Sequence, residues 1–91
     1  MEYEFSAKAY FDAWVFVSLP KEISAEIRNN FKWLEEGWGR LKVSATLGTS
    51  KWQTAIWFDT KQDTYLLPIK ANIRKQEKVI LGDEIKISIV I

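Results

Sequence analysis

The amino-acid sequence predicts a mainly β domain: a β-barrel of about six strands with one α-helix at about residues 21–36. Three observations indicate this fold class. Apolar and polar residues alternate in several short segments, which is the pattern of strands that bury one face. One segment alone carries apolar residues at helical spacing. Clusters of turn-forming residues separate the alternating segments from one another.

The N-terminal region predicts two strands in succession. Between residues 3 and 11 the apolar side chains occupy the odd positions, so we expect a half-buried strand whose odd-numbered side chains face the core. Residues 12 and 13 are expected to turn the chain. Residues 14–19 are aromatic and β-branched, which favours a second strand, and Pro20 ends it.

A single amphipathic helix is expected next. Its apolar residues are spaced by four, four and three positions: Ile23, Ile27, Phe31 and Leu34. This spacing places them in one stripe along a helix. Gly37 and Gly39 follow the stripe and are expected to end the helix, because glycine adopts the backbone conformation that terminates one.

Four further strands are expected in the rest of the chain: residues 40–48, 52–58, 64–69 and 84–91. The first two form a hairpin, and Pro68 in the third indicates an edge or a strand end because proline donates no ladder hydrogen bond. Between the third and fourth strands we expect at most one short helical turn. Gly82 and Asp83 are expected to form the structural turn that leads into the last strand.

The composition narrows the range of functions. The 91 residues are expected to form a single domain, residues 1–91, with a net charge of +1. The sequence contains no cysteine and no histidine, which removes the commonest groups of nucleophilic, acid–base and metal chemistry. We therefore expect no enzyme activity, no metal and no cofactor. The acidic N-terminus and the short apolar runs predict a cytoplasmic protein without a membrane segment.

Several segments, taken together, resemble a known family. The segments that carry the resemblance are residues 14–20, 41–43, 52–54, 65–70, 74–75 and 82–83. In their order and spacing, and over nearly the whole chain, they resemble the domain of unknown function 1905 family of bacteria and archaea.

The resemblance implies a double-split β-barrel, the fold of AbrB-type and MazE-type DNA-binding proteins. It also implies a link to YdeI-type bacteriocin-protection modules, which often occur beside or fused to family members, whose own activity is unestablished. The chain departs from the family in two ways. Ala55 stands where many relatives carry serine, which weakens the case for a polar site there, and the chain ends at Ile91, so we expect no fused module.

A basic segment supplies the first candidate site. Lys70 and Arg74 lie four residues apart, so one helical turn places both on the same face. Arginine binds a carboxylate or phosphate through its bidentate fork, and lysine adds a point charge. The alternative is a solvated loop in which one cation pairs with Asp83 or Glu84.

Aromatic residues near the turns of the central strands are further candidates. Trp52, Trp57 and Tyr65 can form a stacking platform, although the alternative is that they fill the barrel interior. Trp52 and Trp57 are five positions apart, so they face opposite sides of a regular strand. We expect ligand contacts at the barrel mouth near Trp52 and Thr54, next to the basic segment.

These observations predict a small non-catalytic binding domain that holds a small anionic ligand or a partner segment near Lys70 and Arg74. The alternative, suggested by the resemblance, is a nucleic-acid-binding or transcription-related protein of AbrB-like barrel type. The net charge of +1 argues against the alternative, because phosphate contacts dominate such affinity. Both a monomer and a homodimer are compatible with the sequence.

Overall fold

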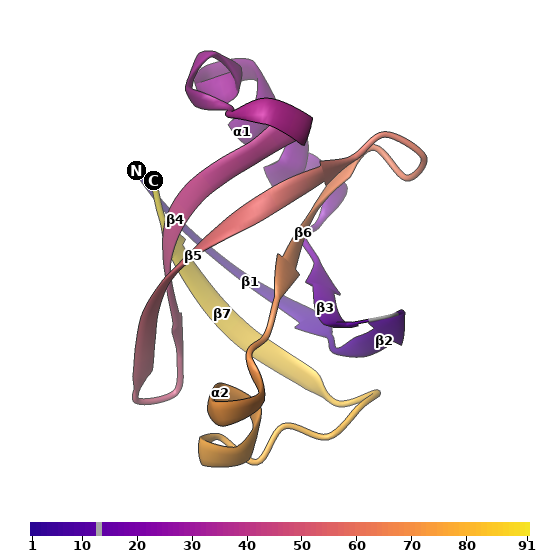
Figure 1. Cartoon of the computed structure of the whole chain (residues 1–91), viewed down its shortest axis with the longest axis vertical. Coiled ribbons are helices and arrows are strands. Elements are labelled where there is room, and N and C mark those ends of the chain that lie inside the picture. Colours follow the sequence, from indigo (N-terminus) through magenta and orange to yellow (C-terminus); the bar gives the residue numbers. More distant parts are fainter. Residues whose placement is uncertain (13) are drawn as a thin grey trace.

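The computed structural model describes residues 1–12 and 14–91, except for the side chains of Asp12 and Trp38. The predicted turn at residues 12 and 13 therefore lies partly outside the described residues. The strands form one antiparallel sheet with the order β1-β7-β4-β5-β6-β3-β2 (Figure 1). Their bounds are β1 Glu2–Lys8, β2 Tyr10–Asp12, β3 Trp14–Ser18, β4 Arg40–Leu47, β5 Ser50–Asp59, β6 Thr64–Pro68 and β7 Glu84–Val90.

The sheet curls because one bent segment occupies both of its ends. β1 and β2 are the two ends of the pairing order, yet only Ala9 separates them in the chain. At the bend, the Ala9 amide donates to the Asp83 carbonyl at 3.2 Å and the Gly82 amide donates to the Ala9 carbonyl at 2.8 Å. A mainly β, barrel-like fold is thereby confirmed. About six strands were predicted and seven are present among the described residues, because the strand expected from residue 3 to 11 divides at Ala9.

The main helix is shorter than predicted. α1 spans Lys21–Phe31, and a 3-10 turn, η1, spans Lys32–Leu34. Phe31 leaves the helical region with φ −128° and ψ 7°, and Glu35 is extended with ψ 133°. The backbone opens here so that the Glu35 carboxylate can accept a hydrogen bond from the Tyr65 hydroxyl. The predicted helix at 21–36 therefore ends at residue 31.

Two smaller helical elements complete the chain. A 3-10 turn, η2, spans Gly37–Gly39 and leads into β4. A short helix, α2, spans Ala71–Gln76, where at most one short helical turn is expected from the sequence. α1 and α2 lie at opposite ends of the molecule (Figure 1). No helix of the described residues is long and apolar enough to cross a membrane.

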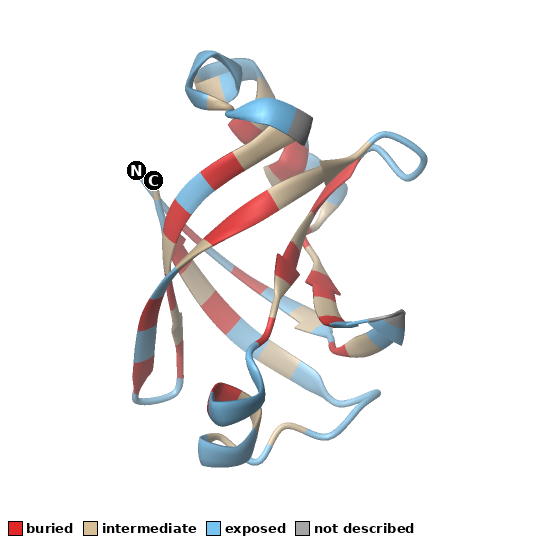
Figure 2. Cartoon of the chain, in the orientation of Figure 1, coloured by how far each residue is buried: buried red, intermediate tan, exposed pale blue. Residues whose placement is uncertain are grey.

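The core lies inside the curled sheet and follows the predicted alternation. Figure 2 shows buried and exposed positions taking turns along the long strands. In the strand predicted from residue 84 to 91, Ile87 and Ile89 are almost fully buried, and Ile85 and Ile91 are partly buried. Phe11 departs from the pattern and is 65% exposed, because β2 has only three residues and lies at the end of the sheet, where little packs over it.

α1 closes one end of the curled sheet through a buried serine. The Ser24 hydroxyl accepts a hydrogen bond from the Tyr65 amide at 3.0 Å and donates to the Leu19 carbonyl at 3.5 Å. Ile27, one turn further along, is fully buried. Burial of an isoleucine of this kind stabilises the fold by about 1.5–3 kcal/mol, so this apolar face holds the helix in place.

Candidate functional site

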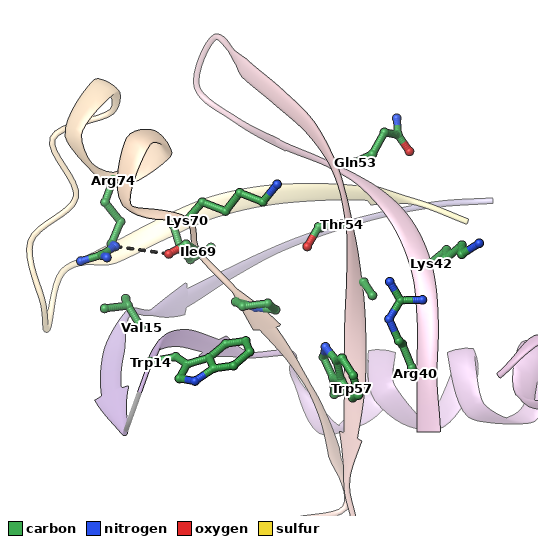
Figure 3. Close-up of a pocket in the computed structure, with 12 residues that line it drawn as sticks. Trp14, Val15, Arg40, Lys42, Gln53, Thr54, Trp57, Ile69, Lys70 and Arg74 are labelled. Carbon is green, nitrogen blue, oxygen red and sulfur yellow. Dashed lines mark hydrogen bonds between the residues drawn. The ribbon is translucent and has the colours of Figure 1, made fainter. Parts of the chain in front are cut away.

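A groove opens where β5 and β6 separate. The pairing between these strands runs only from Trp57 with Leu66 to Asp59 with Thr64, which is three residue pairs. Beyond it, β5 stays paired with β4, and β6 stays paired with β3. The resulting split in the sheet holds a groove with a volume of about 720 Å³ (Figure 3). This volume is in the range of small-molecule sites.

Four cationic side chains line this groove, which we call the basic groove: Arg40, Lys42, Lys70 and Arg74. The first two come from β4; Lys70 immediately precedes α2, and Arg74 lies within it. No carboxylate of the described residues is part of the lining. The side chains therefore present an excess of positive charge to any molecule in the groove.

The two pairs of cations differ in how their charge is balanced. Arg40 forms an ion pair with Glu36, and the Lys42 ammonium lies 3.6 Å from the same carboxylate. Among the described residues, neither Lys70 nor Arg74 has a carboxylate within ion-pairing distance. The second pair thus carries most of the uncompensated charge.

Arg74 is oriented by the backbone. Its Nε donates a hydrogen bond to the Ile69 carbonyl at 3.2 Å, as Figure 3 shows. This bond uses one of the five N–H donors of the guanidinium and leaves the two terminal nitrogens for other partners. Lys70 immediately precedes α2, and its side chain extends toward Thr54 across the groove (Figure 3).

Contacts between α2 and the β4–β5 turn hold this basic segment in position. The Glu77 carboxylate accepts hydrogen bonds from the Ser50 hydroxyl at 2.6 Å and the Thr49 hydroxyl at 3.4 Å. Ile73, in the middle of α2, is buried in the core. We call the contact of Glu77 with residues 49 and 50 the Glu77 clasp. It fixes the end of α2, and with it the placement of Arg74.

The remaining lining is aromatic or neutral. Trp14 and Trp57 lie on β3 and β5, and Gln53 and Thr54 contribute an amide and a hydroxyl. The Arg40 guanidinium carbon lies 5.7 Å from the ring centroid of Trp57, which is a favourable cation–π distance. The groove therefore combines apolar ring faces, neutral hydrogen-bonding groups and positive charge.

Three of the four candidate ligand residues lie in this groove. Thr54, Lys70 and Arg74 line it together, although the first is distant in sequence from the other two. Trp52 does not; the structure places it in the core with 9% exposure. Tyr65 is fully buried as well, so the alternative that these aromatic residues fill the interior holds for Trp52 and Tyr65.

Among the charged, amide and aromatic side chains of the lining, four were not among the residues predicted for the site: Trp14, Arg40, Lys42 and Gln53. The register of β4 with β5 explains why three of them gather. Arg40 pairs with Trp57 and Lys42 with Ala55, while Gln53 pairs with Ser44, so these side chains share the outward face. An arginine and a lysine at alternate positions of one strand were the available signal.

The structure places the predicted turn residues away from this groove. Gly82 has φ 90°, and the Asp83 amide donates to the Ile80 carbonyl at 3.0 Å. Both residues lie in the turn that leads into β7 and contacts Ala9. Among the described residues no cluster of acidic side chains is arranged to hold a metal ion.

A second polar cluster lies beneath α1, apart from the groove. The Tyr65 hydroxyl donates to Glu35, and an Arg28 terminal nitrogen lies 3.5 Å from the same carboxylate. The Arg28 guanidinium also lies 3.8 Å from the centroid of the Phe58 ring. Burial, followed by the hydrogen bond to Glu35, raises the pKa of Tyr65 well above its ordinary value. Arg28 belongs to α1, Phe58 to β5 and Tyr65 to β6, so the cluster joins the helix to these two strands. None of its groups lines the groove.

The curled sheet, closed at one end by α1 and split beside the basic groove, defines a small barrel-like β domain with a cation-lined surface groove. The chain belongs to the family described as domain of unknown function (DUF1905), whose model matches residues 4–89. This match confirms the family resemblance seen in the sequence. No curated protein matches the chain.

Proposed function

We propose that this domain is a non-catalytic binding module that holds a small anionic ligand in the basic groove. The observation that carries the proposal is that four cations from two separate parts of the chain line one groove, with no carboxylate among the described lining residues. On an ordinary solvated surface, lysine and arginine side chains are usually interspersed with acidic side chains. Here the positive charge is gathered around a concavity.

Lys70 and Arg74 are the main ligand contacts in this proposal. Arg74 offers its two terminal nitrogens in a geometry that matches a phosphate or a carboxylate, and Lys70 adds a mobile ammonium. Two charge-assisted hydrogen bonds contribute about 3–6 kcal/mol. A simple anion is therefore expected to bind with a dissociation constant on the order of 1 mM, and a ligand with further contacts more tightly.

The lining supports binding over catalysis. Its ionisable groups are two lysines and two arginines, and the sequence has neither histidine nor cysteine. Arginine stays protonated in proteins and is not a general base. The groove thus offers charge and hydrogen-bond donors for holding an anion and no evident group for accepting a proton.

The small size of the charged region favours a small ligand over nucleic acid. The net charge is +1, and Glu36 balances part of the charge of Arg40 and Lys42. Affinity for a nucleic-acid strand grows with the number of phosphates that are neutralised. One local patch contacts few phosphates, so we expect weak binding to strands.

Calorimetric titration with pyrophosphate tests the proposal. We expect the wild-type chain to bind pyrophosphate. We expect Arg74→Ala to weaken its affinity about 10-fold, because a charge-assisted contact contributes roughly 1.5–3 kcal/mol. Lys61→Ala is the matched control, since Lys61 is exposed in the β5–β6 turn and lies outside the groove. Equal affinities for Arg74→Ala and wild type would contradict the proposal. Tighter, steeply salt-dependent binding to single-stranded DNA would favour the nucleic-acid alternative instead.

A further inference from the structure

Trp14 is an unusually exposed aromatic side chain at the edge of the basic groove. Its exposure is 58%, whereas Trp52 in the core is 9% exposed. Exposed tryptophan at a concave surface is typical of binding sites, because the ring offers a large apolar face at a low cost in side-chain entropy. Figure 3 shows the indoles of Trp14 and Trp57 at one end of the groove, with Lys70 and Arg74 toward another.

The ring of Trp14 is held in place from behind. It stacks on Phe16 with centroids 5.9 Å apart and planes within 6° of parallel. Phe16 in turn packs against Tyr10, whose hydroxyl lies 3.0 Å from the Ser18 hydroxyl. Trp14 lines the groove and Phe16 does not, so the indole contacts Phe16 on one side and still presents exposed surface to the groove. A ring fixed in this way loses little freedom when a ligand stacks on it.

Neutral polar groups also line the groove. Thr54 offers a hydroxyl between the indoles and Lys70 (Figure 3), and Gln53 carries an amide with both donors and an acceptor. A bare inorganic anion can accept hydrogen bonds from these groups, but it leaves the indole rings unused. A ligand with a flat, hydrogen-bonding ring joined to an anion would use all three parts of the lining.

We infer that the ligand of the basic groove is a nucleotide: a heteroaromatic base that stacks on Trp14, joined to a phosphate that is bound by Lys70 and Arg74. This inference rests on the proposed function and adds the ligand class. Stacking on an aromatic side chain accepts any base, while phosphate charge suits the cationic end. The volume of about 720 Å³ and the local extent of the charge favour a free mononucleotide over a nucleotide within a strand.

The test is calorimetric titration of the intact chain with adenosine monophosphate, adenosine, pyrophosphate and an oligothymidine strand. We expect adenosine monophosphate to bind about 10-fold more tightly than adenosine, because the phosphate adds charge-assisted contacts. Trp14→Ala is expected to lower the affinity for adenosine monophosphate about 10-fold and to leave the affinity for pyrophosphate unchanged. Trp14→Phe, which keeps an aromatic face, is expected to retain most of the affinity.

The control is Trp33→Ala. Trp33 is 76% exposed, and its indole N–H donates to the Asn30 carbonyl at the end of α1, so it reports the loss of an exposed tryptophan outside the groove. We expect no change in affinity for either ligand. Circular dichroism and thermal unfolding establish that each variant retains the wild-type fold.

The outcomes separate the two proposals. If Trp14→Ala leaves the affinity for adenosine monophosphate unchanged while Arg74→Ala weakens pyrophosphate, the nucleotide inference is wrong and the anion site stands. If Arg74→Ala affects neither ligand, both are wrong. If the oligothymidine strand instead binds at least 10-fold more tightly than adenosine monophosphate, in a manner that requires Trp14, the groove binds a nucleic-acid strand. The inference of a free mononucleotide is then wrong.

Discussion

Gly48 lies in the turn between β4 and β5, where both the backbone conformation and a neighbouring side chain require a residue without a Cβ atom. Its φ is 60°, a conformation that disfavours residues with a Cβ atom. A Cβ added there would also lie 1.9 Å from Oε1 of Glu77 and 2.9 Å from its Cδ. The missing side chain is therefore what allows the Glu77 clasp to close over the turn.

Gly48→Ala is expected to lower the free energy of unfolding by about 1–3 kcal/mol, through the strained backbone and the displaced Glu77 carboxylate. Gly37→Ala is the matched control, because an added Cβ there meets nothing within 4 Å. We expect it to change stability by less than about 0.5 kcal/mol. Urea denaturation measures both. Equal stabilities of the two variants would show that the clasp and the turn contribute nothing.

At the scale of single residues, the sequence predicted chemistry better than orientation. Lys70 and Arg74 were recognisable because four-residue spacing on a helical turn is a local property. Trp52 and Trp57 were known to face opposite sides of β5, but which of them faces the core depends on the partner strand. The register of β4 settles it by pairing Ala45 with Trp52 and Arg40 with Trp57.

At the scale of elements, the join between α1 and β6 contains a tyrosine that has no access to solvent. Tyr65 is fully buried, and its hydroxyl donates to Glu35. Burial disfavours the phenolate, and the neighbouring carboxylate adds repulsion, so both raise the pKa of Tyr65 above 10.0. This contact joins residues 30 positions apart in the sequence, and it accompanies the departure of the backbone from the helix before Glu35. The apolar stripe is a local pattern that contains no trace of this contact, so it predicted a longer helix.

The raised pKa of Tyr65 predicts a loss of stability in alkali. The unfolded chain releases the proton near pH 10.0, whereas the folded chain keeps it to higher pH. The stabilising contribution is thus fully present below this pH and is lost as the pH rises above it. We expect the free energy of unfolding to fall by up to about 1.4 kcal/mol per pH unit from this residue.

Tyr65→Phe tests this assignment, because phenylalanine keeps the buried ring and removes the titrating hydroxyl. Urea denaturation at pH 9 and pH 11 is expected to show a smaller pH-dependent loss for the variant than for wild type. Tyr3, whose pKa is raised chiefly by burial, remains in both proteins and leaves some dependence in the variant. Identical losses would assign the alkaline effect to groups other than Tyr65.

At the scale of the molecule, the basic groove depends on contacts that no local pattern contains. Alternation predicted the strands and their inner faces, since burial is read from period two. It did not predict where β5 and β6 separate or that the first strand bends at Ala9, because both depend on which strands become neighbours. The split brings Thr54 beside Lys70 and Arg74, and the Glu77 clasp then fixes α2 against the β4–β5 turn.

The Glu77 clasp predicts that anion binding depends on a residue outside the groove lining. Removing a carboxylate near a basic site should by itself strengthen anion binding, because it removes repulsion. Glu77→Ala also releases the end of α2 from Ser50, so we expect pyrophosphate affinity to fall about 3- to 10-fold as Arg74 loses its fixed placement. Faster amide exchange in α2 is expected to accompany the fall.

Glu77→Gln separates the two effects, since glutamine removes the charge and still accepts a hydrogen bond from the Ser50 hydroxyl. We expect this variant to bind pyrophosphate as tightly as wild type or more tightly, with amide exchange in α2 close to that of wild type. If instead Glu77→Ala and Glu77→Gln both strengthen binding, the carboxylate acts only through its charge, and the clasp has no role in placing Arg74. Weaker binding by Glu77→Ala together with undiminished binding by Glu77→Gln distinguishes control through the placement of α2 from control through charge.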